Sequence, residues 1–187
     1  LANYYGKDLD PPPLRAEAIP PDFGTRVARV RDAARAEGLY TRLLKVRPSQ
    51  RTARRFGRFY ERLGRLDEAL AMFKTAIGNK PGDPRAWLAL ARVYTRRSAR
   101  DGHKPRVAGG EPDYRSALRI YGYMLATWPE QGLKPCFHRA RTLEFVGQRE
   151  EALLAWRDYL SRYADAAGGE LPASIARRAL ERLTKGS

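Results

Sequence analysis

The chain contains little cysteine and little asparagine, and it lacks long hydrophobic runs. Its one cysteine, Cys136, excludes an internal disulfide and fits a reducing compartment. No apolar run approaches the roughly 18 residues that a membrane-spanning helix needs, and no secretory hydrophobic region is visible. The sequence does not determine the compartment, but these absences favour a cytoplasmic or membrane-associated location.

Acidic residues are also in short supply. The 187 residues include 36 Lys and Arg against 21 Asp and Glu, which gives a formal net charge of +15, and Arg supplies most of the cations. A surplus of this size predicts acidic surroundings, namely a protein surface, nucleic acid or anionic lipid. An apolar content of 43% excludes a chain that is disordered throughout. The length suits one domain or a short repeat array.

Proline is concentrated at the start of the chain, where DPPPL and IPPDFG predict an extended arm over residues 1–24. The chain begins at Leu1 rather than Met, so we expect a processed or trimmed product, and a lost anchor or signal stays open. From about Arg26 onward the apolar residues recur at three- and four-residue spacing, which is typical of helices. No alternating strand pattern is found in the sequence.

A pattern of small, aromatic, apolar and helix-breaking residues recurs with gaps of 4, 3 and 5 residues. A second motif, which also contains small residues, precedes three of its copies. Two helices cross closely only where one side of the contact is small, so these positions predict tightly packed helix pairs. The four copies are Ala36, Tyr40, Leu43, Pro48; Ala69, Phe73, Ala76, Pro81; Ala117, Tyr121, Met124, Pro129; and Ala152, Trp156, Tyr159, Ala164. The preceding motifs are Ala53, Phe56, Gly57, Tyr60, Gly64; Trp87, Leu90, Ala91, Tyr94; and Cys136, Ala140, Leu143, Gly147.

These residues resemble the tetratricopeptide repeat (TPR) family, most clearly in GRLDEALAMFKTAIGNKP (64–81) and WLALARVY (87–94). Tyr40 and Phe73 are 33 residues apart, close to the family period of about 34. Phe73 and Tyr121 are 48 residues apart, which places an insert of about 14 residues between the helices of the middle repeat.

The resemblance implies an all-α fold: a short right-handed TPR-type α-solenoid of about three helix pairs. A C-terminal capping helix and the extended Pro-rich N-terminal arm complete it. The predicted segments are the arm at 1–24, a degenerate first repeat or helix at 25–49, repeats at 50–83, 84–131 with an inserted loop at 99–112, and 132–166, and the capping helix at 172–184.

No catalytic motif is present: the sequence contains no P-loop, GxSxG, HExxH or dinucleotide fingerprint. Cys136 and His138 are two residues apart on a predicted helix, where their side chains point away from each other. We therefore expect no enzyme activity, no metal site, no cofactor and no small-molecule substrate.

Cations on the first helices of the predicted pairs are the candidate binding residues. In the family these helices line the concave face, and Arg58, Arg92 and Arg141 hold equivalent places there, so we expect them to form a row. Arginine can hold a carboxylate or a phosphate with two parallel hydrogen bonds. The alternative interpretation is a solvated basic face. The predicted partner-binding residues are Arg51, Arg54, Arg55, Arg58, Arg85, Arg92, Arg96, Lys134 and Arg141.

Three functions follow from this pattern. The first is a non-catalytic scaffold or adaptor that binds an acidic peptide or protein surface through a basic concave groove, as a subunit of a larger assembly. Some family members clamp a C-terminal carboxylate with Lys, Arg and Asn, but the only asparagines, Asn3 and Asn79, lie off the first helices, which favours a broader acidic segment. The second is an RNA-binding or ribonucleoprotein-associated subunit. The third is a peripheral subunit of a membrane complex whose N-terminal anchor is missing from this chain.

Overall fold

The computed structural model describes residues 23–46, 48–104, 109–163 and 173–185, with the backbone alone for residues 23–31. Helices are the regular elements of these ranges, and no strand occurs in them, which confirms the all-α prediction. None of the helices in these ranges combines the length and apolar character needed to cross a membrane. Residues 1–22 of the predicted arm lie outside the described residues, and Phe23 already begins a helix.

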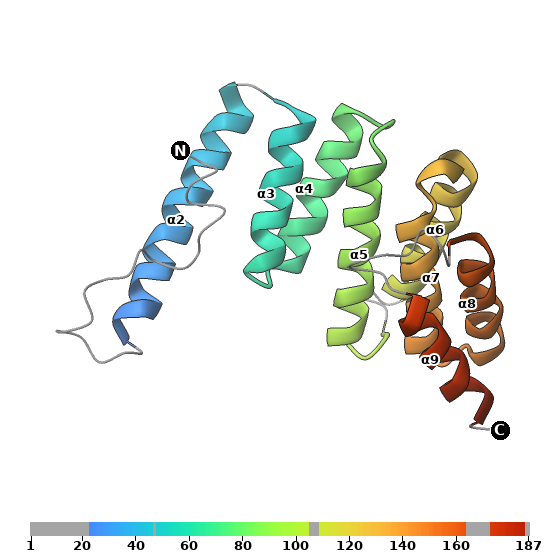
Figure 1. The fold of residues 1–187 in the computed structure, drawn as a ribbon. Helices are drawn as coiled ribbons and strands as arrows, with labels where there is room; N and C mark the ends of the chain where they lie inside the picture. The colour runs from blue at the N-terminus through green and yellow to red at the C-terminus, as the bar shows by residue number, and fades with distance from the viewer. Residues whose placement is uncertain (1–22, 47, 105–108, 164–172, 186–187) are drawn as a thin grey trace. The chain divides into compact units, whose positions relative to one another are not determined.

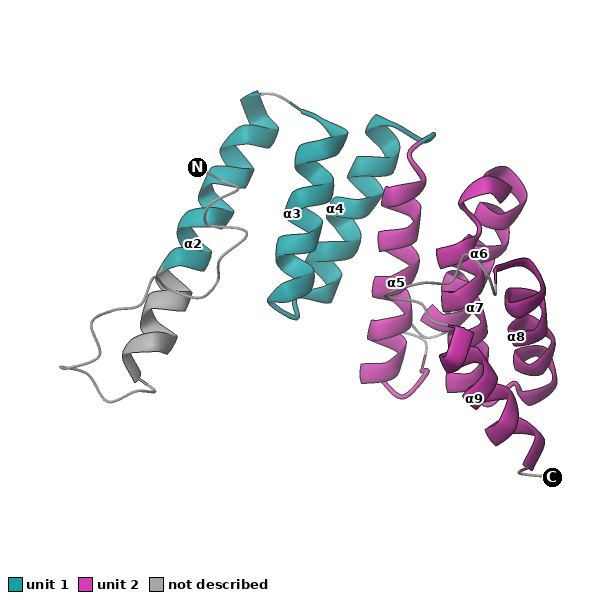
Figure 2. Ribbon diagram, in the orientation of Figure 1, with its two compact units in different colours: residues 1–82 teal, residues 83–187 magenta. Residues whose placement is uncertain are grey.

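The chain divides into two compact units, residues 1–82 and residues 83–187 (Figure 2). The first unit contains α2 (Phe23–Val46), α3 (Gln50–Arg62) and α4 (Leu66–Asn79) (Figure 1). Helix α3 packs mainly against α4, and α2 packs against α3. The region predicted as a degenerate first repeat thus contributes a single described helix, α2.

Small residues set the crossing of α3 and α4. Ala69 and Ala76 on α4 are fully buried. A Cβ added to Gly57 on α3 would lie 2.8 Å from Cε1 of Phe73, so only glycine leaves room for this ring. The structure therefore accounts for the small residues of the repeat pattern by close helix contact.

A polar contact holds α2 to the α3–α4 pair. The carboxylate of Glu37 accepts a hydrogen bond of 2.8 Å from the hydroxyl of Tyr60 and one of 2.7 Å from Nη1 of Arg65. Burial raises the pKa of Glu37, but the hydrogen bonds from Arg65 and Tyr60 outweigh that effect and leave the pKa below its ordinary value. The carboxylate therefore stays ionised at neutral pH and keeps both partners.

The second unit contains a series of helices joined by short turns and one longer insert. Helix α5 pairs with α6, and α7 pairs with α8; α7 also packs against α5 and α6, and α9 packs against α8. The elements are α5 (Pro84–Arg100), α6 (Asp113–Thr127), the 3₁₀ turn η1 (Pro129–Gln131), α7 (Leu133–Phe145), α8 (Arg149–Tyr163) and α9 (Ala173–Lys185).

Helix α5 is capped at its start and runs further than the sequence pattern suggests. The side chain of Asp83 accepts a hydrogen bond of 3.1 Å from the backbone N–H of Arg85, and Pro84 occupies the first turn. The helix continues to Arg100, so the first two residues of the predicted insert at 99–112 are helical.

Helix α9 is fixed on the α7–α8 pair by buried alanines and by polar contacts. Ala176 and Ala179 are fully buried in the core formed with α7 and α8. The guanidinium group of Arg149 donates to the carbonyl of Leu183 from Nε at 2.8 Å and also from Nη2. These contacts cover the apolar side of α8 at this end of the second unit.

Candidate binding site

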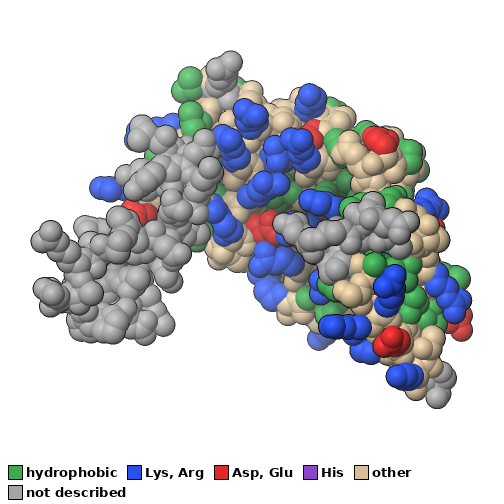
Figure 3. All heavy atoms as spheres, viewed as in Figure 1, with side chains coloured by type: hydrophobic (Ala, Val, Ile, Leu, Met, Phe, Trp, Pro, Cys, Tyr) green, Lys and Arg blue, Asp and Glu red, His purple; other side chains and the backbone are tan. Residues whose placement is uncertain are grey.

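Helix α3 carries four of the predicted cations and presents an exposed stripe. Arg51, Arg55, Arg58 and Arg62 are exposed and follow one another at helical spacing, opposite the buried side of the helix. Arg54 is only partly exposed. Lys and Arg side chains gather over α3 and α4 on the face shown in Figure 3. The first unit thus offers a basic surface on α3.

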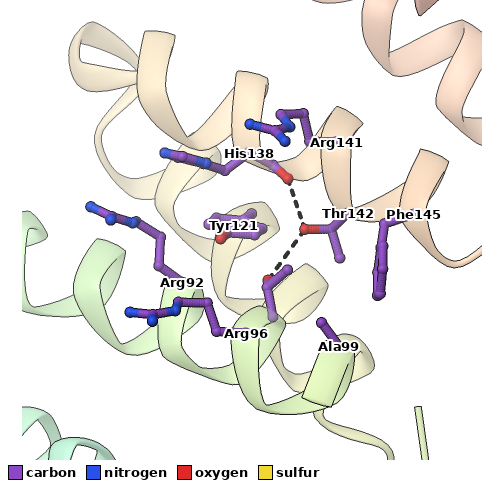
Figure 4. A pocket seen from close by; sticks show the side chains of 9 residues that line it. Arg92, Arg96, Ala99, Tyr121, His138, Arg141, Thr142 and Phe145 are labelled. Carbon is purple, nitrogen blue, oxygen red and sulfur yellow. Dashed lines mark hydrogen bonds between the residues drawn. The ribbon is translucent and has the colours of Figure 1, made fainter. Parts of the chain in front are cut away.

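In the second unit, a cavity of about 280 Å³ lies between α5, α6 and α7. We call it the α5–α7 pocket. Three arginines line it, and no Asp or Glu is among the described residues that do so. The lining residues are Arg92, Thr95, Arg96, Ala99, Tyr121, His138, Arg141, Thr142 and Phe145 (Figure 4).

Threonine hydroxyl groups form the floor of the pocket and join α5 to α7. The Oγ1 of Thr142 donates to the carbonyl of His138 at 2.8 Å, and the Oγ1 atoms of Thr95 and Thr142 lie 3.3 Å apart (Figure 4). The ring of Tyr121 on α6 stacks on the ring of His138, with centroids 6.2 Å apart. The pocket is therefore built on side chains held from three helices.

The positive charge of the pocket comes from its guanidinium groups. Burial, together with the charges of Arg92, Arg141 and Lys134, lowers the pKa of His138 to about 4. At neutral pH the imidazole is uncharged and can donate one hydrogen bond and accept another. The guanidinium of Arg141 lies 5.9 Å from the centroid of the Phe137 ring, which helps to hold its orientation.

The structure brings three of the nine predicted site residues together, Arg92, Arg96 and Arg141. Arg85 and Lys134 are exposed on α5 and α7 but do not line the pocket. Arg51, Arg54, Arg55 and Arg58 all belong to α3 in the first unit. A row that joins Arg58 to Arg92 and Arg141 would involve both units and stays a prediction.

Sequence reasoning missed six lining residues, although helical spacing could have found some of them. His138, Thr142 and Phe145 follow the same face of α7 as Arg141. Thr95 and Ala99 follow Arg92 in the same way on α5. Tyr121 matches the core pattern of the repeat, so its place in the pocket depends on the packing of α6 against both helices.

The side chains of Cys136 and His138 have different surroundings. The thiol of Cys136 donates toward Oδ2 of Asp158 at 3.7 Å, whereas His138 stacks on Tyr121. Burial and the adjacent Asp158 raise the pKa of Cys136 to about 12, so the thiol stays protonated. Within the described ranges, no group of three or more His, Cys, Asp and Glu is arranged to hold a metal ion.

The comparison with known families fits this arrangement of helix pairs. The tetratricopeptide repeat profile matches residues 22–84 and 54–124, which together span more than half of the chain. The chain belongs to the tetratricopeptide repeat family. The prediction of a TPR-type fold is thereby confirmed, and the matched residues include the α3–α4 pair, α5 and most of α6.

Solved TPR structures share this fold at low sequence identity. MamA AMB-1 is similar with a TM-score of 0.59 and 14% identity, over 99% of this chain and 81% of that one. A thermophilic TPR protein from Thermus thermophilus is similar with a TM-score of 0.57 and 19% identity, over 87% of this chain and 78% of that one. No curated protein matches the chain. At these identities the likeness concerns the fold of this TPR protein alone.

Proposed function

We propose that this TPR protein is a non-catalytic scaffold or adaptor that binds an acidic peptide or an acidic protein surface through exposed arginines. The TPR fold is that of a protein-interaction scaffold. The observation that supports the acidic partner is the α5–α7 pocket, which three arginines line and whose described lining residues include no carboxylate. The exposed stripe on α3, defined by Arg51, Arg55, Arg58 and Arg62, supplies further positive charge.

Guanidinium groups suit this partner for a geometric reason. Their planar forks can hold carboxylates through paired hydrogen bonds, and clustered positive charge accelerates encounter with an acidic surface. A short array of repeats has few internal interfaces, so an occupied binding surface would also add to its stability. We therefore place the protein within a larger assembly.

RNA binding has less support than an acidic protein partner. Sequence-tolerant binding of single strands uses a series of exposed aromatic side chains on which successive bases stack. Among the described residues, the exposed large aromatics are Tyr123 on α6 and Phe145 on α7. Two such residues do not form a stacking series, so charge alone would have to carry an RNA complex.

The test uses the full chain as bait in native lysate and identifies the proteins that it retains. The variant Arg58→Glu with Arg92→Glu is expected to lose the acidic partner while keeping the melting temperature of the wild type. Both side chains are exposed, so their replacement leaves the helix cores intact. Unchanged retention of the same partner by this variant would contradict the proposal.

A matched control separates position from charge. Arg115→Glu with Arg157→Glu changes the net charge equally, at exposed sites outside the pocket and outside α3. This variant is expected to keep the partner. A filter-binding titration with RNA at two salt concentrations tests the alternative: micromolar or tighter binding that falls steeply with salt would favour RNA.

A further inference from the structure

The α5–α7 pocket has two chemically different ends. We infer that it accepts two side chains of one extended peptide segment: an acidic side chain and, two residues away, an aromatic or large aliphatic side chain. This inference rests on the proposed function and specifies the acidic partner further. It concerns the second unit alone, because all the lining residues belong to α5, α6 and α7.

The cationic end holds the guanidinium groups. In Figure 4, Arg92 and Arg96 extend from α5 toward the same side as the ring of His138, and Arg141 points the same way from α7. Ala99 and Phe145 lie at the other end of the pocket (Figure 4). A ligand with acidic side chains alone would pair with the guanidinium groups of the first end and leave the second end exposed to water.

The apolar end presents an aromatic side chain that is costly to leave in water. Phe145 is 47% exposed, although most large apolar side chains of α7 are buried. Its ring packs on the ring of His103, with centroids 4.6 Å apart, so the side chain is held rather than free to turn away. A supported, exposed ring in the same pocket as three arginines is suited to an apolar group that is tethered to an acid.

The first turn of the insert supplies this support. Gly102 and His103 both have positive φ, 63° and 65°, and the N–H of His103 donates to the carbonyl of Ser98 at 2.8 Å. This left-handed turn after α5 brings the imidazole of His103 against Phe145. The turn that follows α5 thus supports Phe145 from outside the lining of the pocket.

The backbone spacing of the lining residues on α5 guides the spacing that we assign to the ligand side chains. Ala99 lies five residues beyond the midpoint of Arg92 and Arg96, which corresponds to about 7.5 Å along α5 at a rise of about 1.5 Å per residue. Side chains two apart on an extended chain share one face and are separated by about 6.6 Å. We therefore assign an acid-x-aromatic segment, whose two side chains have a spacing close to that of these backbone positions.

The volume favours side chains of an extended segment over a whole helix. The cavity of about 280 Å³ lies just below the range of about 300–1,000 Å³ that ordinary small-molecule pockets occupy. A helix with its side chains is about 10–12 Å across and does not enter such a space.

The test measures fluorescence anisotropy of labelled peptides with the full chain. The first peptide is Ser-Gly-Glu-Ser-Phe-Gly-Ser; its matched partners replace Phe by Ala, replace Glu by Gln, or place five residues between Glu and Phe. We expect the first peptide to bind at least about tenfold more tightly than each partner, as burial of one Phe side chain allows. Equal affinity of the Phe and Ala peptides, or of the two spacings, would overturn the inference.

Two variants test which residues bind each of the two ligand side chains. Phe145→Ser should abolish the advantage of Phe over Ala while keeping that of Glu over Gln, and Arg141→Gln should do the reverse. Leu154→Ser and Arg157→Gln, both exposed on α8, are the matched controls and should change neither ratio. Melting curves check the fold of each variant; because Phe145 and Arg141 are exposed, we expect little change.

A peptide of eight glutamates separates this inference from the proposed function. If it binds and the Phe residue adds nothing, the acidic partner stands and the two-ended pocket is wrong. If neither peptide type binds at low salt, both proposals fail. If the Glu-x-Phe peptide binds, and each variant abolishes the affinity advantage assigned to its end, the proposed function and the two-ended pocket are both supported.

Discussion

At the scale of single residues, steric room decides which side chains the helix pairs accept. Gly57 faces the ring of Phe73, which is fully buried and has no space to withdraw into. Gly122 lies in the middle of α6, and a Cβ added there would meet no atom within 4 Å. The two glycines therefore have the same helical backbone and opposite tolerance of a methyl group.

Gly57→Ala is expected to destabilise the protein by about 1 kcal/mol. Overpacking against Phe73 costs about 1–3 kcal/mol, and the better helix propensity of alanine returns about 1 kcal/mol. Gly122→Ala, the control, should instead stabilise by about 0.5–1 kcal/mol. Urea unfolding of both variants measures the difference, and equal stabilisation by the two substitutions would show that Gly57 is not under steric pressure.

His138 predicts a specific pH dependence of stability. It faces Arg92 from α5, Tyr121 from α6, and Lys134 and Arg141 on its own helix, and burial followed by these charges lowers its pKa to about 4. The unfolded chain protonates this imidazole near pH 6.5. The contribution of neutral His138 is therefore complete above about pH 6.5 and is lost as the pH falls from there toward about 4.

We expect His138→Gln to remove that part of the pH dependence, on the order of 3 kcal/mol between the two limits. Urea unfolding at about pH 7, 6 and 5 on wild type and variant measures it. The difference between the two proteins isolates His138 from the carboxylates that titrate in the same range. Parallel stability curves for wild type and variant would contradict the prediction.

At the scale of elements, a buried ion pair closes the insert between α5 and α6. Arg97 in the last turns of α5 donates to both carboxylate oxygens of Asp113 at the start of α6, from Nε at 2.5 Å and from Nη2 at 2.7 Å. Their side chains are 13% and 6% exposed. This bidentate contact holds the two helices together where about a dozen residues separate them in the chain.

Asp113→Ala should destabilise the protein by about 3–5 kcal/mol, because it leaves the guanidinium of Arg97 buried without this carboxylate. Arg119→Ala, which breaks the exposed pair with Glu111 at 3.3 Å, should stay within about 0.5 kcal/mol. Replacing both buried partners, as Arg97→Met with Asp113→Leu, should recover most of the loss. Chemical denaturation of the three variants is the measurement, and similar costs for Asp113→Ala and Arg119→Ala would refute the role of the buried pair.

At the scale of the whole molecule, the net charge of +15 acts on both stability and binding. Like charges repel one another in the folded state and attract an acidic partner. Added salt weakens both effects, since the Debye length falls from about 10 Å at 0.1 M to about 3 Å at 1 M.

The two effects predict opposite responses to salt. Raising the salt concentration from about 0.05 M to about 0.5 M should raise the melting temperature of the free protein and lower its affinity for the eight-glutamate peptide. Calorimetry and anisotropy on the same preparation measure the two trends. A melting temperature that falls over this range would show that exposed ion pairs outweigh the repulsion between arginines.

The repeat pattern predicted the helical class well because its signal is local. Ala69, Phe73 and Ala76 lie on one face of a helix whatever surrounds them. Their small and large side chains also indicate how closely a neighbouring helix can pack on that face. The same repeat pattern predicts that Arg92 and Arg141 hold equivalent positions on the first helices of their pairs. The other pocket residues of α5 and α7 share a helix face with these two arginines, whereas Tyr121 reaches the pocket only because α6 packs against both helices.

The sequence by itself determined the all-α class, the family and the basic character of the surface, because side-chain size, helical spacing and charge are properties of neighbours along the chain. Only the tertiary structure decided that Tyr121, His138 and Phe145 share a pocket with three arginines, and that the ring of His103 packs on the ring of Phe145. These groupings join residues far apart in the chain, and close packing of α5, α6 and α7 is what brings them within contact distance.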